Sequence, residues 1–176
     1  MRPLPIGLFA NESGAAVIEL ALLAPILAVL AIGTVDLSNA FSMKLALEQG
    51  AQRAIEKIMQ TTQETTVEST LATEAVCQVN GTNSDGSCKT SPITASNVTV
   101  TWRLLCTDSS GTTTSQTTTD STAFDAMSCA TGSTSARYVQ IKVTETYTPI
   151  FSLHFGGYSS TDGGYDVSAT AGMRTS

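Results

Sequence analysis

The run from Ala15 to Val35, AAVIELALLAPILAVLAIGTV, constrains the fold of this chain more than any other feature. It is about twenty residues long and apolar apart from one charge, Glu19, and this is the length that a helix needs to cross a hydrocarbon core roughly 30 Å thick. An ordinary secretory signal has a shorter apolar stretch, roughly 7–15 residues, followed by a small-residue cleavage site. No such site follows Val35, so we predict a retained transmembrane helix over residues 15–35.

The cysteines indicate the compartment of the rest of the chain. Their number is even, all four lie in the last hundred residues, and they form no C-x-x-C pair: Cys77, Cys88, Cys106 and Cys129. Two structural disulfides are therefore expected, and disulfides persist in an oxidising compartment. We place residues 63–176 in the periplasm or outside the cell, and the N-terminus in the cytoplasm. Three pairings are open, and we favour Cys77 with Cys88 and Cys106 with Cys129 because each closes a local loop.

Charge and composition exclude two classes of function. The net charge is −6 with 9 basic residues and no Lys/Arg cluster, which is the wrong electrostatic footprint for nucleic acid. The single histidine, His154, lies between apolar Leu153 and Phe155, and no serine has a nucleophile-elbow context. We predict no enzymatic activity, no cofactor and no metal site, and we interpret Asp36 as a residue that ends the anchor rather than a proton acceptor.

The order Gly14, Ala15, Ala16, Val17, Ile18, Glu19 carries the most functional information. If residues 1–14 are a leader that is cleaved after Gly14, Glu19 is the fifth residue of the mature chain. A carboxylate within an apolar span costs on the order of 2.5–3.5 kcal/mol and normally has a partner. The new α-amino group of Ala15 in a neighbouring copy would be such a partner and would fix the stagger between subunits. The alternative is that Glu19 snorkels to the headgroups.

The stretch from Ser13 to Ala54 resembles the TadE-like family of pseudopilins, which are minor components of the tight-adherence (Tad) pilus machinery. In that family a short leader ends in Gly, Glu follows at the fifth mature position, and an Ala-Pro-containing helix leads to an Asp and an aromatic residue. The matching positions are Gly14, Glu19, Ala24, Pro25, Asp36 and Phe41. The leader is poorer in basic residues than is usual, and Leu20 follows Glu19 where the major pilin tends to have an aromatic residue.

The resemblance implies a pilin-like fold and a role as a minor pilin or pseudopilin in pilus assembly and surface adhesion. It also implies processing by a prepilin peptidase, and partners that include other pilin and pseudopilin subunits, the inner-membrane assembly platform and membrane lipid. Such a protein lies in the bacterial inner membrane with a single span, and can also enter the extracellular pilus. The competing hypothesis is a single-pass envelope protein whose external domain is a binding module.

Two features within the span concern its shape and packing. Pro25 removes one backbone hydrogen bond near the middle of the helix and predicts a kink there. Ala24 and Ala28 form a small-xxx-small pair that would let a second helix approach closely. The other interpretation of these alanines is that they simply fill an apolar span.

Beyond the membrane the pattern becomes amphipathic and then alternating. Apolar residues at steps of 3 and 4 predict that the helix continues over residues 36–62, ending near Gln60. Thr61 to Thr70 is rich in Thr and Glu and predicts a frayed end or linker, whereas 107–121 predicts a Ser/Thr surface loop. Alternation predicts strands near 98–104, 139–143 and 165–173. The expected fold is α+β, with a small antiparallel sheet covered by the amphipathic helix.

Overall fold

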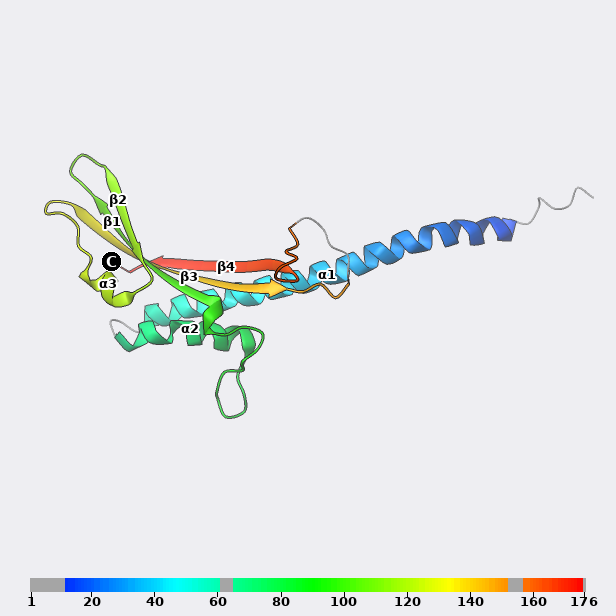
Figure 1. Ribbon diagram of the computed structural model, residues 1–176, viewed down its shortest axis with the longest axis horizontal. Helices are drawn as coiled ribbons and strands as arrows, with labels where there is room; N and C mark the ends of the chain where they lie inside the picture. The colour runs from blue at the N-terminus through cyan, green and yellow to red at the C-terminus, as the bar shows by residue number, and fades with distance from the viewer. Residues whose placement is uncertain (1–11, 61–64, 152–156, 176) are drawn as a thin grey trace, which may run out of the picture.

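The computed structural model describes residues 12–60, 65–151 and 157–175, and its dominant element is the helix α1, Glu12–Gln60 (Figure 1). At 1.5 Å per residue its 49 residues extend over about 70 Å. The N-terminal part projects from the rest of the molecule, whereas the C-terminal part packs against the sheet and a second helix. The described part of the helix extends to Gln60, and residues 61–64 lie outside the described ones.

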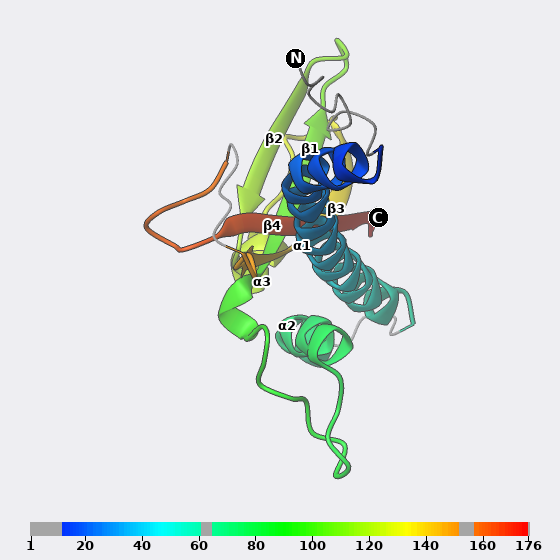
Figure 2. The ribbon, with the colours of Figure 1, turned by 90° about the vertical axis from the view of Figure 1, so that its right-hand side faces the viewer.

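The second helix, α2, Thr65–Asn80, corrects the predicted linker. It runs antiparallel to the outer part of α1, and the two lie side by side in both views (Figures 1 and 2). Leu71 and Ala75, one turn apart, are fully buried between the helices. The start of α2 is rich in Thr, which has weak helix propensity, and in polar Glu, and the apolar packing residues come only later in the helix. The sequence pattern therefore did not indicate a helix here.

Gly50 lets the two helices approach closely. A Cβ atom at this position would lie 2.5 Å from Val79 Cγ2 and 3.0 Å from the carbonyl oxygen of Ala75. An ion pair of 3.2 Å between Lys57 Nζ and Glu74 Oε1 joins the same helices further along. The absence of a side chain at Gly50 therefore sets the separation of α1 and α2.

The sheet has four antiparallel strands in the order β2-β1-β3-β4. The strands are β1 (Val98–Thr107), β2 (Thr113–Thr118), β3 (Thr134–Tyr147) and β4 (Tyr165–Arg174). Trp102 lies opposite Val139, which in turn lies opposite Met173, so the three predicted strands align their apolar residues on one face. The α+β fold predicted from the sequence is confirmed.

The core lies between that face of the sheet and the two helices. α1 packs along β3 and β4, and α2 lies nearer β1. Successive side chains of a strand point to opposite faces of the sheet, so every second residue lies in this core and the residues between them lie on the outer face. The largest fully buried side chains are Leu47, Leu71, Ile93, Leu104, Ile141, Val139 and Val143.

Strand β2 corrects the prediction of a surface loop over 107–121. Five of its six residues are exposed in the burial pattern, so it is an edge strand without an alternating apolar face. Threonine nevertheless suits a pleated backbone because its β-branched side chain is already restricted. A turn stabilised by Asp108, whose carboxylate accepts from the amides of Ser110 and Thr112, returns the chain from β1 to β2. The hydrogen bond from the Ser110 hydroxyl, followed by the backbone amides, lowers the pKa of Asp108.

A short helix, α3, Ser121–Ala126, closes one end of the core. Its N-cap Asp120 accepts from the amides of Thr122 and Ala123, as capping aspartates do. Phe124 from this helix stacks on Trp102 with 5.4 Å between ring centroids. The guanidinium carbon of Arg137 lies 4.6 Å from the centroid of the Phe124 ring, and this guanidinium donates a hydrogen bond to the carbonyl of Met127.

Candidate functional site along the N-terminal helix

The N-terminal part of α1 is apolar and uncovered by the rest of the protein. One stretch of this helix is long and apolar enough to cross a membrane, and none of that stretch is buried within the protein. A core helix of a soluble protein would be covered by its own domain. The arrangement is therefore compatible with the predicted single-pass anchor. α1 continues through Pro25 without a break, and a kink at this residue stays a prediction.

Glu19 lies exposed on this part of the helix. Within the described residues it forms none of the ion pairs, which all lie further along the chain. Gly14 and Ala15, the predicted processing site, lie in the first turns of α1. Pairing of Glu19 with the Ala15 amine of another copy needs a cleaved chain and a neighbour, and it stays a prediction.

An apolar stripe continues along α1 beyond the predicted span. Leu37, Phe41 and Leu45, spaced by four residues, are 58%, 58% and 55% exposed. On the same helix Met43 is partly buried against the protein's own core and Leu47 is 0% exposed. Residues four apart share one face of a helix, so α1 presents an uncovered apolar face beside the face that packs against the core. We refer to Leu37, Phe41 and Leu45 as the exposed stripe.

Asp36, at the junction between the predicted span and the exposed stripe, holds the end of β3 against α1. Its Oδ1 accepts from the hydroxyl of Tyr147 at 3.0 Å and from the amide of Ile150 at 2.9 Å. Its Oδ2 accepts from the amide of Phe151 at 3.4 Å. Three donors on one carboxylate satisfy much of its hydrogen-bonding capacity, so Asp36 is a structural junction and not merely the end of an anchor.

The buried Tyr147 has a raised pKa. Burial is the main cause, and the hydrogen bond to Asp36 and the negative charge of that carboxylate act in the same direction, whereas the Asn39 side chain opposes them. A cavity of about 250 Å³ lies beside this junction; it is lined by Gly33, Asp36, Leu37, Ala40, Tyr147, Pro149 and Tyr165. The cavity is apolar apart from the carboxylate and the tyrosine hydroxyls.

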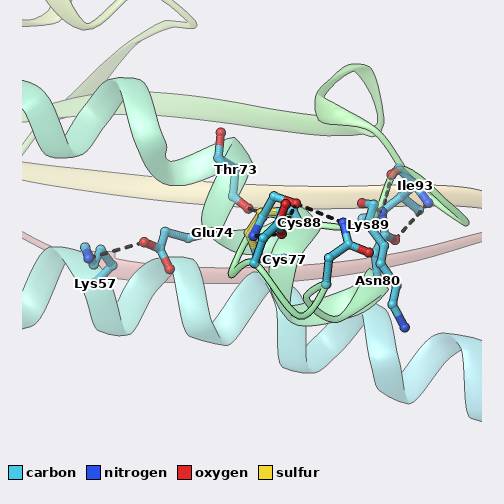
Figure 3. Close-up of a disulfide and its surroundings, with 11 residues drawn as sticks. Lys57, Thr73, Glu74, Cys77, Asn80, Cys88, Lys89 and Ile93 are labelled. Carbon is cyan, nitrogen blue, oxygen red and sulfur yellow. Dashed lines mark hydrogen bonds and ion pairs between the residues drawn. A yellow bond between two sulfur atoms is a disulfide. The ribbon is translucent and has the colours of Figure 1, made fainter.

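Both disulfides are present, and each joins cysteines that close a local loop, as the sequence favoured. Cys77 pairs with Cys88 and Cys106 pairs with Cys129. The first bond connects the end of α2 to the segment that follows it (Figure 3). The second ties β1 to the chain after α3.

Asn80 closes the loop around the Cys77–Cys88 bond. Its side-chain amide donates to the carbonyls of Lys89 and Ile93 at 2.7 and 2.6 Å, and its oxygen accepts from the amide of Ile93 at 3.0 Å (Figure 3). The loop beyond it projects from the body of the molecule (Figure 1). At its tip the hydroxyl and amide of Ser87 bind Asp85 and lower the pKa of that carboxyl.

Sequence reasoning missed three of these residues. Asp36 was interpreted only as an end of the anchor, because its partner Tyr147 lies 111 positions away. No sequence signal marks Asn80 as the residue that closes its loop. Gly50 carries no recognisable signal beyond being a glycine within a helix, which costs stability unless close packing requires it. His154 lies outside the described residues. Among those that the structure does describe, no group of three potential metal ligands occurs.

The fold and these features define a class of protein: a single long helix, apolar at its N-terminal end, that carries a small disulfide-bonded α+β domain. Residues 14–55 match the model of the TadE-like protein family, so the predicted resemblance is confirmed. The match includes Glu19, Pro25, Asp36 and Phe41 and indicates a structural, minor-pilin-like role associated with a Tad pilus. Comparisons with curated proteins and with solved structures give no significant match.

Proposed function

We propose that this chain is a minor pilin or pseudopilin of a tight-adherence pilus, which assembles with other pilin subunits through α1 and serves surface adhesion. Prepilin peptidase cleaves it after Gly14, and residues 15–35 hold it in the inner membrane until it joins the filament through the assembly platform. Residues 63–176 then face the periplasm or the cell exterior. The match of residues 14–55 to the TadE-like family supports this proposal.

The observation that carries the proposal is the exposed stripe. Lipid can cover the apolar part of α1 up to Val35, and the protein's own core covers the face of α1 that carries Met43, Leu47 and Ala51. Leu37, Phe41 and Leu45 lie beyond the predicted span and are more than half exposed, so neither covers them. Contiguous exposed apolar surface of this kind marks protein–protein contacts, and a stripe along a single helix can pack against the helix of a neighbouring subunit.

The role proposed for Glu19 follows from the cost of its position. An ionised carboxylate in an apolar span is unfavourable without a partner, and cleavage would create a cationic amine at Ala15. In two copies shifted along the membrane normal, these groups can meet. The pair would then select neighbours with the correct stagger, which is a recognised use of buried charge pairs.

Intact-mass measurement of the membrane-extracted protein tests the processing step. The expected mass is that of a chain starting at Ala15, and a mass that includes Met1 would contradict cleavage after Gly14. Glu19→Ala tests the assembly step, with Glu48→Ala on the outer part of α1 as the matched control. Under the proposal, Glu19→Ala abolishes incorporation into sheared pili while membrane insertion persists. If the chain is instead an anchored binding module, Glu19→Ala should change only the energetics of membrane insertion, and Glu48→Ala should have no effect.

A further inference from the structure

The segment that follows β3 exposes apolar side chains although its backbone is held in place. Ile150 is 63% and Phe151 37% exposed. Their amides donate to the two oxygens of Asp36, so the segment is tied to α1 at a defined residue. Thr148 to Phe151 carries no charge. A tethered loop that presents apolar side chains outward differs from an ordinary solvated turn, whose residues are mostly polar.

The position of Asp36 defines where this segment lies relative to the membrane. The predicted span of 15–35 is 21 residues long, and at 1.5 Å per residue it extends roughly 30 Å, the thickness of a bilayer hydrocarbon core. Asp36 is the next residue and therefore lies at the outer boundary of that core. Ile150 and Phe151, bonded to Asp36, lie at the same level.

We propose that the segment Pro149–Phe151 contacts the lipid surface, with Ile150 and Phe151 in the interfacial region of the leaflet that faces the domain. The proposal rests on the membrane anchor of the proposed function. A lipid surface is the occupant because the apolar loop continues the apolar surface of the span, where Val35 is 50% exposed. Asp36 is the positioning residue, since it holds the loop at the depth where apolar side chains gain from burial.

Such a contact would orient the whole domain. A single helix leaves the domain free to tilt, whereas a second point of contact beside the helix limits the tilt. The end of the sheet where β3 finishes at Tyr147 would then face the membrane, and the hairpin between β1 and β2 would point away from it (Figure 1). Subunits held in one orientation present their exposed stripes in a uniform way to incoming neighbours.

Depth-dependent fluorescence quenching tests this proposal in the full chain. The protein is reconstituted in phosphatidylethanolamine–phosphatidylglycerol vesicles whose lipids carry bromine at a shallow or a deep acyl position. Trp102 is buried in the core, so the unmodified chain gives the background. Three single variants report other sites: Ile150→Trp in the loop, Leu27→Trp in the middle of the span, and Ser110→Trp in the distant hairpin.

Shallow bromines should quench Ile150→Trp roughly twofold more than deep bromines, because the loop lies at the edge of a core about 30 Å thick. Leu27→Trp should show the opposite order, and Ser110→Trp should match the background. Asp36→Asn combined with Ile150→Trp should lose most of the shallow quenching while Trp102 emission stays native. Unchanged quenching in that double variant would overturn the positioning role of Asp36.

The remaining outcomes separate the loop from the anchor. If Leu27→Trp is quenched but Ile150→Trp is as unquenched as Ser110→Trp, the lipid contact is wrong and the anchor stands. If Ile150→Trp is unquenched but shifts to the blue as the protein-to-lipid ratio rises, a second copy covers the loop and the lipid contact is again wrong. If Leu27→Trp is not quenched, the anchor and the loop contact both fail.

Discussion

At the scale of single residues, Asp36 connects parts of the chain that are far apart in sequence. It follows the predicted span, and its carboxylate accepts hydrogen bonds from the Tyr147 hydroxyl and from the amides of Ile150 and Phe151. Hydrogen bonds to a charged acceptor are stronger than neutral ones. Asp36 therefore adds a polar attachment between the sheet and α1, beside the apolar core that packs the same helix against the sheet.

Removal of this carboxylate should destabilise the domain. Asp36→Ala leaves the buried Tyr147 hydroxyl without its acceptor, and the expected loss is about 2 kcal/mol of unfolding free energy. Denaturant unfolding of the detergent-solubilised chain, followed by Trp102 fluorescence, measures it. Ser38→Ala, at an exposed position on the same helix, is the control and should change stability by less than about 0.5 kcal/mol. Equal stabilities for the two variants would show that the junction contributes nothing.

The raised pKa of Tyr147 predicts a loss of stability at alkaline pH. Its main cause is burial, followed by the bond to Asp36 and that residue's charge. The folded-state pKa lies above the ordinary tyrosine value of 10.0. The stabilisation is therefore complete below pH 10.0 and is lost as pH rises through the folded-state pKa. Tyr147→Phe should therefore flatten the decline of unfolding free energy above pH 10.0 relative to the unchanged chain. Parallel stability–pH curves for the two proteins would refute this assignment.

At the scale of elements, the sequence predicted what local periodicity determines. The helix to Gln60 and the strands β1, β3 and β4 have clear periods of 3.6 or 2, because one face of each is buried. α2 was missed because its polar start conceals a stripe formed by Leu71 and Ala75. β2 was missed because an exposed edge strand needs no apolar alternation, and its pairing with β1 depends on a turn rather than on its own composition.

The close packing of α1 and α2 predicts the effect of a single methyl group. Gly50→Ala gains helix propensity of about 1 kcal/mol, but its Cβ would meet Val79 and the backbone of Ala75. Overpacking costs typically about 1–3 kcal/mol, so a net destabilisation is expected. Gly33→Ala is a matched control in the same helix, because a Cβ there meets nothing within 4 Å. Thermal unfolding of both variants compares them, and a Gly50→Ala protein as stable as Gly33→Ala would contradict the close approach.

The disulfides predict a second effect at this scale. Replacing Cys106 and Cys129 together by serine opens a loop with a separation of 23 residues, and the chain-entropy relation gives a loss of about 3 kcal/mol. Cys106 belongs to the same core cluster as Trp102 and Phe124, so the near-ultraviolet signal of the tryptophan should change. Denaturant midpoints and circular dichroism measure these two effects. A midpoint equal to that of the unchanged chain would show that α3 docks without the bond.

At the scale of the whole molecule, α1 is divided into three environments. Lipid is predicted around residues 15–35, the protein's own core covers the face with Met43, Leu47 and Ala51, and the exposed stripe lies on the uncovered face beyond the predicted span. The sequence predicted an amphipathic helix but not where its own domain would stop covering it. That boundary depends on how far the sheet extends along the helix, which results from strand lengths and from the Asp36 junction, both of which are non-local.

Phe41→Asp tests whether this uncovered part serves assembly. Phe41 is 58% exposed and contributes little to the folded core, so the unfolding free energy should change by less than about 0.5 kcal/mol. Burial of a phenylalanine against a partner is worth about 1.5–3 kcal/mol, so the amount of this subunit in sheared pili should fall by about tenfold or more. Gln52→Asp, an exposed polar position on α1, is the control for charge and should leave incorporation unchanged. Normal incorporation of Phe41→Asp would show that the exposed stripe faces no subunit, and a stability loss of several kcal/mol would show that it packs within the chain.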